Sequence, residues 1–319
     1  MSRELTIWLN GEFVEAERAE VSALDAGLQH GVGLFETMLG VGGKVFRLHK
    51  HLERLQVSAR VLGLSESARI NPLAEAVRRV VERAGLERAR VRLTMTGGDL
   101  RMLGPAGSGA TTPTVVITAQ PVTERPREMF ERGALVMVGS GRVNPLDPTA
   151  GHKTLNYWMR LRELREAARA GASEALMLQV TNHVAGGAVS NVFVVKDGVA
   201  LTPIARGEEQ EVAGEAQGGG AGEVSGRQSV RTLASPVLPG VTRAFVREAL
   251  EARGVRVERR MLSVADVLDA DEVFLTNSQW GALPVSRVEG KTIGAGSVGE
   301  MTRAVVEAWD AATVSGDEG

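Results

Sequence analysis

The segment PVTERPREMFERG, residues 121–133, constrains the fold most, because it divides the sequence into two parts. It is charged, contains two prolines and lacks the apolar periodicity of a helix or a strand. A chain of 319 residues is long enough for two domains of ordinary size. The segment therefore predicts an interdomain linker, with an N-terminal domain at 1–120 and a C-terminal domain at 134–311. We expect 312–319 to form a disordered tail.

The part before the linker mixes strand and helix patterns. In LTIWLNGEFV, two short strand-like runs flank Asn10-Gly11, which is a strong hairpin signal. Leucines recur at helical spacing within 45–63, and a second helix fits 72–84. Residues 90–96 and 112–120 have the composition of strands. Together these patterns predict a small α+β domain.

The part after the linker predicts a larger α/β domain. Its predicted helices are 155–170, 241–253 and 297–309, and its predicted strands are 134–139, 175–180, 189–195, 198–202, 255–259 and 272–276. In the first of these helices one face is apolar, formed by Leu155, Trp158, Leu161, Leu164 and Ala168.

Residues 208–226, EEQEVAGEAQGGGAGEVSG, are acidic and rich in glycine. Such a segment has too little apolar surface to offset the entropy of ordering it. We therefore expect a flexible surface insertion within the C-terminal domain.

Charge and composition exclude several classes of function. Lys plus Arg is 37 and Asp plus Glu is 39, so the net charge of −2 gives no reason to expect a nucleic acid or an anionic membrane as partner. Because the chain contains no cysteine, disulfides, thiolate metal sites and a cysteine nucleophile are excluded. No apolar run has the length of a signal peptide or a membrane span. We expect a cytoplasmic protein that acts on a small molecule and carries no metal.

The motif GHKTLNYW places Lys153 in a loop just before a helix, together with the only tyrosine of the chain, Tyr157. A lysine in a loop is usually solvated and inert. Alternatively, a lysine that is partly desolvated beside other cations has a lowered pKa and forms a Schiff base with a carbonyl group.

Two further motifs combine small polar residues with loop signals. In LPGVTR, Val241 and Thr242 begin a helix, where Thr242 can act as a cap or the free backbone N–H groups can bind a phosphate. In FLTNSQWGALPV, a strand ends at Asn277 and Ser278, which suit either a turn or the rim of an anion site.

Taken together, these motifs resemble the class IV aminotransferase family, the pyridoxal-phosphate enzymes of fold type IV. The resemblance extends over nearly the whole chain, through WLNGEF, DAGLQHGVGLFETM, HLERL, HKTLNY, NHVAGGAVSNVF, LPGVTR and FLTNSQWGALPV in that order. It implies the cofactor pyridoxal 5'-phosphate and a fold with a small N-terminal α+β domain and a larger C-terminal α/β domain. It also implies a homodimer, with the active site between the two domains of each subunit.

The resemblance assigns roles to three residues from two motifs, HKTLNY and HLERL. Lys153 would bind the cofactor covalently and carry the proton at the substrate carbon. Arg54, in HLERL, would bind the cofactor phosphate. Tyr157 corresponds to a tyrosine that hydrogen-bonds the ring oxygen of the cofactor in branched-chain enzymes, although a tyrosine at a helix start is often structural.

The resemblance assigns five more residues to the cofactor. Leu238 would lie behind the pyridine ring, and the backbone amides of Val241 and Thr242 would bind the phosphate. Asn277 and Ser278 would supply the remaining phosphate contacts.

The reaction is indicated by two short patterns. Phe35-Glu36-Thr37 and the NSxxG pattern at 277–281 resemble 4-amino-4-deoxychorismate lyases, whereas branched-chain aminotransferases usually have FEG and GTAAE there. The resemblance therefore implies release of 4-aminobenzoate and pyruvate, within folate synthesis, with Thr37 near the substrate. Because the motifs are shared, a D-amino-acid or branched-chain transaminase is the alternative.

The stretch NHVAGGAVSNVF departs from the family pattern, in which VAEG stands where this chain has VAGG. Gly186 replaces the glutamate that pairs with the pyridine nitrogen and strengthens the cofactor as an electron sink. Three interpretations follow, namely a weak or redirected enzyme, recruitment of another group such as water, or cofactor binding without turnover. A second departure is Thr96-Gly97-Gly98 in place of Thr-Arg-Gly, where Arg101 could bind the substrate carboxylate instead.

Overall fold

The computed structural model describes residues 5–65, 68–99, 112–209 and 233–316. The chain forms two compact units. The first comprises Met1–Arg125, His152–Tyr157 and Trp309–Gly319, and the second comprises Pro126–Gly151 and Trp158–Ala308. The first division therefore falls inside 121–133. Arg101 and most of the acidic segment 208–226 lie outside the described residues.

The first unit contains a six-stranded antiparallel sheet with the strand order β2-β1-β6-β5-β3-β4. The strands are β1 (Thr6–Leu9), β2 (Glu12–Val14), β3 (Gly33–Val41), β4 (Lys44–Val45), β5 (Arg88–Thr96) and β6 (Val115–Pro121). The predicted hairpin is confirmed, because Asn10 and Gly11 connect β1 to β2 with positive φ angles of 47° and 113°.

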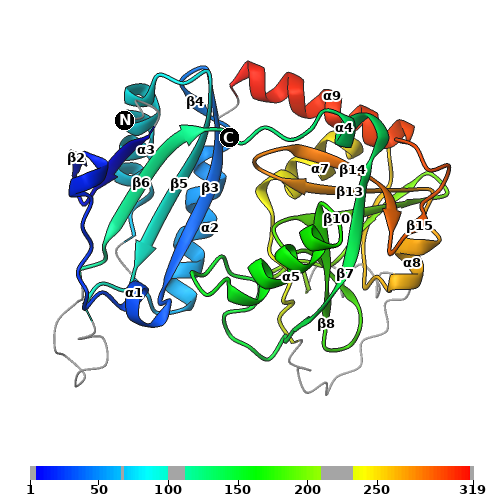
Figure 1. Ribbon diagram of the computed structural model, residues 1–319, viewed down its shortest axis with the longest axis horizontal. Helices are drawn as coiled ribbons and strands as arrows, with labels where there is room; N and C mark the ends of the chain where they lie inside the picture. Colours follow the sequence, from blue (N-terminus) through cyan, green and yellow to red (C-terminus); the bar gives the residue numbers. More distant parts are fainter. Residues whose placement is uncertain (1–4, 66–67, 100–111, 210–232, 317–319) are drawn as a thin grey trace, which may run out of the picture. The chain divides into compact units, whose positions relative to one another are not determined.

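Two helices, α2 (Leu48–Val61) and α3 (Ile70–Ala84), cover one face of this sheet (Figure 1). Along β3 the side chains alternate, so Leu34 and Met38 enter the core with these helices while Phe35 and Thr37 point to the opposite face. Both helices lie close to their predicted ranges. The short segments α1 (Ala26–His30) and Ala16–Arg18 complete the unit.

Segment 152–157 groups with the first unit, although it lies within the range expected for the C-terminal domain. The physical reason is backbone pairing with β3. The N–H of Phe35 donates to the carbonyl of Lys153 at 2.9 Å, and the N–H of Leu155 donates to the carbonyl of Gly33 at 2.9 Å. The lysine motif is therefore held beside β3.

The second unit contains a mixed sheet that has nine strands within the described residues, in the order β12-β11-β10-β13-β14-β7-β8-β9, with β15 beside β14. The strands are β7 (Ala134–Val143), β8 (Glu174–Gln179), β9 (Val184–Gly187), β10 (Asn191–Lys196), β11 (Val199–Thr202), β12 (Val257–Arg259), β13 (Glu272–Asn277), β14 (Gly281–Val288) and β15 (Lys291–Thr292). Buried aliphatic residues from β8, β10, β13 and β14 form its core.

The helices after β6 are α4 (Glu128–Arg132), α5 (Trp158–Arg169), α7 (Val241–Glu251), α8 (Val264–Leu268) and α9 (Glu300–Ser315). Because α9 extends to Ser315, the expected disordered tail at 312–319 is wrong for 312–315. Thr313 is buried there, and its hydroxyl donates to the carbonyl of Asp310. Within the described ranges, no helix has the length and apolar character needed to cross a membrane.

The apolar face that we expected on the helix at 155–170 is not the buried face of α5. Trp158 and Leu161 are 76% and 46% exposed, whereas Glu163 and Ala167 are buried. The cause lies in β7, which has an irregular register between Val138 and Arg142. The backbone N–H of Ser140 at this irregularity donates to Glu163 at 2.8 Å, which draws the carboxylate inward.

Candidate active site

Lys153 is placed against aromatic side chains of the first unit. Its Nζ atom lies 4.3 Å from the centroid of the Phe35 ring and 5.4 Å from that of Tyr157. The two rings meet edge to face at 5.1 Å. Such rings attract a cation through their electron-rich faces and keep water from that side of the amine. The predicted residues Lys153 and Tyr157 therefore lie together.

A second cation, Arg92 on β5, shares the Phe35 ring with Lys153. Its guanidinium carbon lies 3.9 Å from the ring centroid, and its Nε donates to the hydroxyl of Thr94 at 3.2 Å. Burial, followed by the charge of Arg90, lowers the pKa of Arg92, although an arginine remains charged at neutral pH. Thr37 lies directly opposite Arg92 in the β3–β5 register, so its side chain is on the same face.

Arg54 is held on the other face of β3 by a buried carboxylate. Nε of Arg54 donates to one oxygen of Glu36 at 2.8 Å, and Nη2 donates to the other oxygen. The Nδ1 atom of His51 also lies 2.8 Å from that second oxygen. Glu36 and His51 are fully enclosed, whereas 11% of the Arg54 side chain is exposed.

The protonation states in this cluster follow from its charges. Burial alone would raise the pKa of Glu36, but the charge of Arg54 and the hydrogen bonds from His51 and Arg54 lower it to about 2. Burial lowers the pKa of His51, and the charges of Arg54 and Lys153 act in the same direction against the raising effect of Glu36. We infer a neutral imidazole whose Nδ1–H donates to an ionised Glu36, because a carboxylate can only accept.

In the second unit, the N-terminus of α7 is buried without a side-chain cap. Gly240 occupies the N-cap position, and both Val241 and Thr242 are buried. The hydroxyls of Thr242 and Ser278 are 3.5 Å apart. The hydroxyl of Thr276 is enclosed and has no hydrogen-bond partner among the described residues. Uncapped N–H groups, the helix dipole and several hydroxyls suit a phosphate, so these residues fit the cofactor.

The loop before α7 is held by Asn191. Its amide nitrogen donates to the carbonyl of Leu238 at 2.9 Å. A Cβ atom at position 240 would lie 1.9 Å from the side-chain oxygen of Asn191, so this close approach requires Gly240. Asn191 thereby fixes the position of Leu238 relative to the start of α7.

The side chain of Asn277 is engaged within the loop that presents Ser278. Its oxygen accepts from the backbone N–H groups of Gln279 and Trp280 at 2.9 and 3.2 Å, and its nitrogen donates to the carbonyl of Val189 at 3.2 Å. A phosphate contact from Asn277 would therefore involve its backbone, while Ser278 has a hydroxyl directed at Thr242.

Position 186 is closed to a side chain. Gly186 has a φ of +136°, and a Cβ atom there would lie 2.9 Å from the carbonyl oxygen of Ser190. The buried carboxylate of Glu174 fixes this segment by accepting from the N–H groups of Ala188 and Val189 at 3.1 and 3.3 Å and from the hydroxyl of Ser190 at 3.1 Å. Position 186 therefore supplies no carboxylate. The neighbouring carboxylate of Glu174 is already engaged by the donors of Ala188, Val189 and Ser190.

Sequence reasoning missed His51, Arg92 and Glu174. A signal existed for His51, which precedes Arg54 by three residues and so shares its helix face. A signal also existed for Arg92, which alternates with apolar residues in RVRLTMT and therefore points away from the core. Glu174 has no local signal, because its partners lie after the next turn. Within the described ranges, no cluster of three or more His, Asp or Glu side chains could hold a metal ion.

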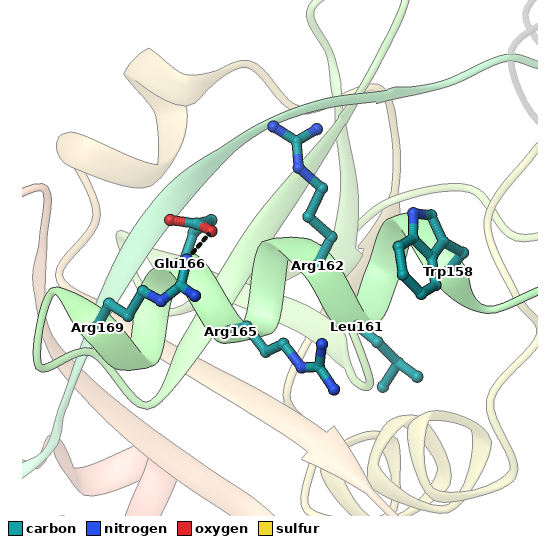
Figure 2. A pocket seen from close by; sticks show the side chains of 6 residues that line it. All are labelled: Trp158, Leu161, Arg162, Arg165, Glu166 and Arg169. Atoms are coloured by element: carbon teal, nitrogen blue, oxygen red, sulfur yellow. Dashed lines mark hydrogen bonds and ion pairs between the residues drawn. The ribbon is translucent and has the colours of Figure 1, made fainter.

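The exposed side of α5 carries a pocket (Figure 2), lined by Trp158, Leu161, Arg162, Arg165, Glu166 and Arg169. The dashed line in Figure 2 marks the ion pair between Glu166 and Arg169. None of the predicted site residues lines this pocket, so it gives no support for a cofactor site on α5.

The chain matches the family described as Amino-transferase class IV over residues 33–208 and 226–288. Among curated proteins, it is 30% identical over 309 residues to the branched-chain-amino-acid aminotransferases of Escherichia coli (strain K12) and Salmonella typhimurium. The alignment covers 95% of this chain and 91% of each relative.

Solved structures of branched-chain aminotransferases and of a 4-amino-4-deoxychorismate lyase are also similar to this chain. The crystal structure of the Escherichia coli branched-chain amino acid aminotransferase matches with a TM-score of 0.82 and 29% identity, covering 98% of this chain and 96% of the other. The T.th. branched-chain amino acid aminotransferase with pyridoxamine 5'-phosphate matches with a TM-score of 0.81 and 26% identity, covering 98% of this chain and 94% of the other. The 4-amino-4-deoxychorismate lyase from Pseudomonas aeruginosa matches with a TM-score of 0.75 and 29% identity, covering 94% of this chain and 97% of the other.

Proposed function

We propose that this chain, which belongs to the class IV aminotransferase family of pyridoxal-phosphate-dependent enzymes, is a 4-amino-4-deoxychorismate lyase. It would convert that substrate into 4-aminobenzoate and pyruvate. No second substrate is needed, because the atoms of the two products add up to those of the substrate.

In this proposal, three residues of separate roles bind the cofactor. Lys153 binds it covalently, Arg54 binds its phosphate, and Tyr157 contacts its ring oxygen. When bound, the cofactor withdraws electrons from the substrate carbon that carries the amino group. Lys153 removes the proton from that carbon, and the bond from the neighbouring carbon to the ether oxygen of the enolpyruvyl group breaks. The released enolpyruvate takes up a proton and becomes pyruvate, while the ring becomes aromatic.

Further cofactor contacts would come from the start of α7, the loop before it and the loop after β13. The N–H groups of Val241 and Thr242 and the hydroxyl of Ser278 hold the phosphate, as the uncapped start of α7 favours. Leu238 packs behind the ring, at a position fixed by Asn191. Asn277 contributes through its backbone and by ordering the loop.

The substrate carboxylates would be bound by arginine. Arg92 is a partly buried cation on the same aromatic ring as Lys153, and Thr37 is its cross-strand neighbour. A guanidinium in such surroundings binds a carboxylate through charge-assisted hydrogen bonds. The sequence pattern adds Arg101 as a candidate for the second carboxylate.

One observation carries the lyase proposal, namely that position 186 accommodates no acidic side chain. The family resemblance places at this position the glutamate that strengthens electron withdrawal by the cofactor. A reaction whose product becomes aromatic needs the least electron withdrawal, because aromaticity itself stabilises the product. The patterns FET and NSxxG support the same assignment.

The second candidate is a transaminase acting on branched-chain or D-amino acids. It is supported by the 30% identity to branched-chain-amino-acid aminotransferases over 95% of the chain. A relative that binds the cofactor without turnover is a third candidate, and it too is suggested by Gly186.

A single set of assays separates these candidates. The purified holoenzyme is incubated with 4-amino-4-deoxychorismate, and 4-aminobenzoate is measured by its fluorescence. Parallel reactions contain 2-oxoglutarate with L-leucine, L-valine or D-alanine. Formation of 4-aminobenzoate without a 2-oxo acid supports the lyase, whereas transamination alone contradicts it. Cofactor binding without either product identifies the third candidate.

We also propose that the enzyme acts as a homodimer. Three apolar side chains near α1 are exposed within eight residues of one another, with exposed fractions of 41% for Val21, 57% for Leu24 and 67% for Leu28. Contiguous exposed apolar patches mark interfaces, and we propose that these three side chains belong to one. Light scattering of the purified protein tests the proposal, with Leu28→Asp expected to shift the mass from dimer to monomer. A monomeric wild type would contradict it.

A further inference from the structure

The cluster of Glu36, His51 and Arg54 contains one group without an assigned role, His51. We propose that His51 is a positioning residue, which fixes the Glu36 carboxylate so that Glu36 in turn orients Arg54 toward the cofactor phosphate. This inference rests on the proposed role of Arg54 as a phosphate ligand.

The contacts of Glu36 define the orientation of the guanidinium. One carboxylate oxygen accepts from Nε of Arg54, and the other accepts from Nη2. These two parallel bonds place the carboxylate and the guanidinium in one plane. The guanidinium group of arginine is planar and rigid and has five N–H donors. Fixing the donors on one side of the group therefore fixes the direction of the others. The carboxylate plane of Glu36 therefore sets the direction in which Arg54 binds an anion.

His51 determines that carboxylate plane. Its Nδ1–H donates at 2.8 Å to the same Glu36 oxygen that accepts from Nη2 of Arg54. Arg54 cannot fix the plane alone, because its side chain is long, rotatable and partly exposed. The imidazole is fully buried and has only two side-chain torsions, so it is the rigid member of the cluster.

The chain positions the cluster through two adjacent elements. His51 and Arg54 lie three residues apart on α2 and therefore on one helix face, and Glu36 comes from β3 beneath that helix. Glu36 adjoins Phe35, which contacts Lys153 from the other face of the strand. Two adjacent residues of β3, Phe35 and Glu36, thus contact Lys153 and Arg54, one on each face of the strand.

A purely structural role for His51 makes a different prediction. If His51 only stabilises the fold, its loss weakens binding of any ligand to the same extent. If it acts through Arg54, its loss weakens ligands that carry a phosphate and spares those that lack one. Pyridoxal 5'-phosphate and pyridoxal share the ring and the aldehyde and differ in the phosphate, so the ratio of their dissociation constants separates the two roles.

The test measures both dissociation constants by absorption titration of the cofactor-free full-length protein. Asparagine places an N–H donor where Nδ1 of histidine stands, whereas glutamine places it one bond farther out. We expect His51→Asn to keep the dissociation constant for pyridoxal 5'-phosphate within about threefold of wild type, and His51→Gln and His51→Leu to raise it roughly tenfold or more. Binding of pyridoxal should change less than about twofold in all three variants.

Two control variants keep the outcomes distinct. Glu53→Gln, on the same helix with an exposed side chain paired to Lys50, should leave both constants unchanged. Arg54→Ala should weaken pyridoxal 5'-phosphate selectively. If Arg54→Ala weakens both ligands equally, the proposed role of Arg54 fails. If Arg54→Ala is selective for the phosphate but His51→Gln and His51→Asn behave alike, the positioning role of His51 is overturned, even where His51→Leu does not fold.

Discussion

The amine of Lys153 lies 4.3 Å from the centroid of the Phe35 ring, and the residue after Phe35 on the same strand is the Glu36 that binds Arg54. Because side chains alternate along β3, its two faces serve two different purposes. One face presents an aromatic ring to a lysine, and the other presents a carboxylate to an arginine. A shift of one residue in the register of β3 would disrupt both contacts together.

Replacement of Lys153 by alanine should abolish covalent cofactor binding and reduce turnover by about a hundredfold or more, because the variant lacks the amine that we propose moves the proton. Visible absorption of the purified protein and the mass of the borohydride-reduced chain provide the measurements. Lys50→Ala is the matched control, since Lys50 is an exposed lysine on α2 that pairs with Glu53. Retention of the covalent adduct in Lys153→Ala would assign the role to another lysine.

Replacement of Arg92 by glutamine should raise KM for the carboxylate substrate by about 10- to 100-fold, because a charge-assisted hydrogen bond of about 1.5 to 3 kcal/mol is lost. The turnover number should change much less. Steady-state kinetics measure both. Arg90→Gln, two residues earlier on the same strand face, serves as the control and should leave KM near that of wild type. An unchanged KM in Arg92→Gln excludes Arg92 from carboxylate binding.

Local sequence patterns predicted most of the secondary structure. The hairpin at Asn10-Gly11 and the helices α2, α3 and α7 are confirmed close to their predicted ranges, because turn chemistry and apolar periodicity act over a few residues. The family motifs likewise indicated Lys153 and Tyr157, which the structure brings together.

Contacts between residues far apart in the sequence could not be predicted in this way. Glu36 and His51 pair across the packing of β3 against α2, and nothing in either motif specifies that packing. The segment around Lys153 groups with a strand that precedes it by more than a hundred residues in the sequence. On α5, the apolar spacing suggested a buried Trp158, but Ser140 in β7 binds Glu163 on the inner side instead.

Glu36 should contribute a pH-dependent part of the stability. Its pKa of about 2 in the folded protein lies below the ordinary value of 4.5. The ionised carboxylate therefore stabilises the folded state fully above pH 4.5, and this contribution is lost as the pH falls toward 2. Replacement by glutamine should lower the free energy of unfolding at pH 7 by about 3 kcal/mol, because it leaves Arg54 without its buried partner.

Urea unfolding at several pH values between 7 and 2 measures this contribution as the difference between Glu36→Gln and wild type. The difference should shrink below pH 4.5. Other groups also titrate there, including Asp266 with a pKa of about 2, so the wild-type curve alone is not informative. Glu53→Gln is the control with an exposed carboxylate. A difference that stays constant down to pH 2 would show that folding does not lower the pKa of Glu36.

Replacement of Gly186 by alanine should destabilise the protein by about 3 kcal/mol, because the backbone has a φ of +136° and the new Cβ atom would meet the carbonyl of Ser190 at 2.9 Å. Gly198→Ala is the matched control, since Gly198 also has a positive φ, +75°, but no atom lies within 4 Å of a Cβ there. Gly198→Ala should lower the free energy of unfolding by about 1 kcal/mol. Thermal unfolding compares the two variants.

The same strain applies to Gly186→Glu, which restores the acid of the family pattern. We expect this variant to be as unstable as Gly186→Ala, so a loss of activity in it would reflect the backbone and not the cofactor. If Gly186→Glu is instead as stable as wild type, the segment relaxes to accept a side chain, and its activity becomes a direct measure of what the missing carboxylate contributes. The stability of this variant therefore decides whether Gly186 is required by the local backbone conformation or marks a lost catalytic group.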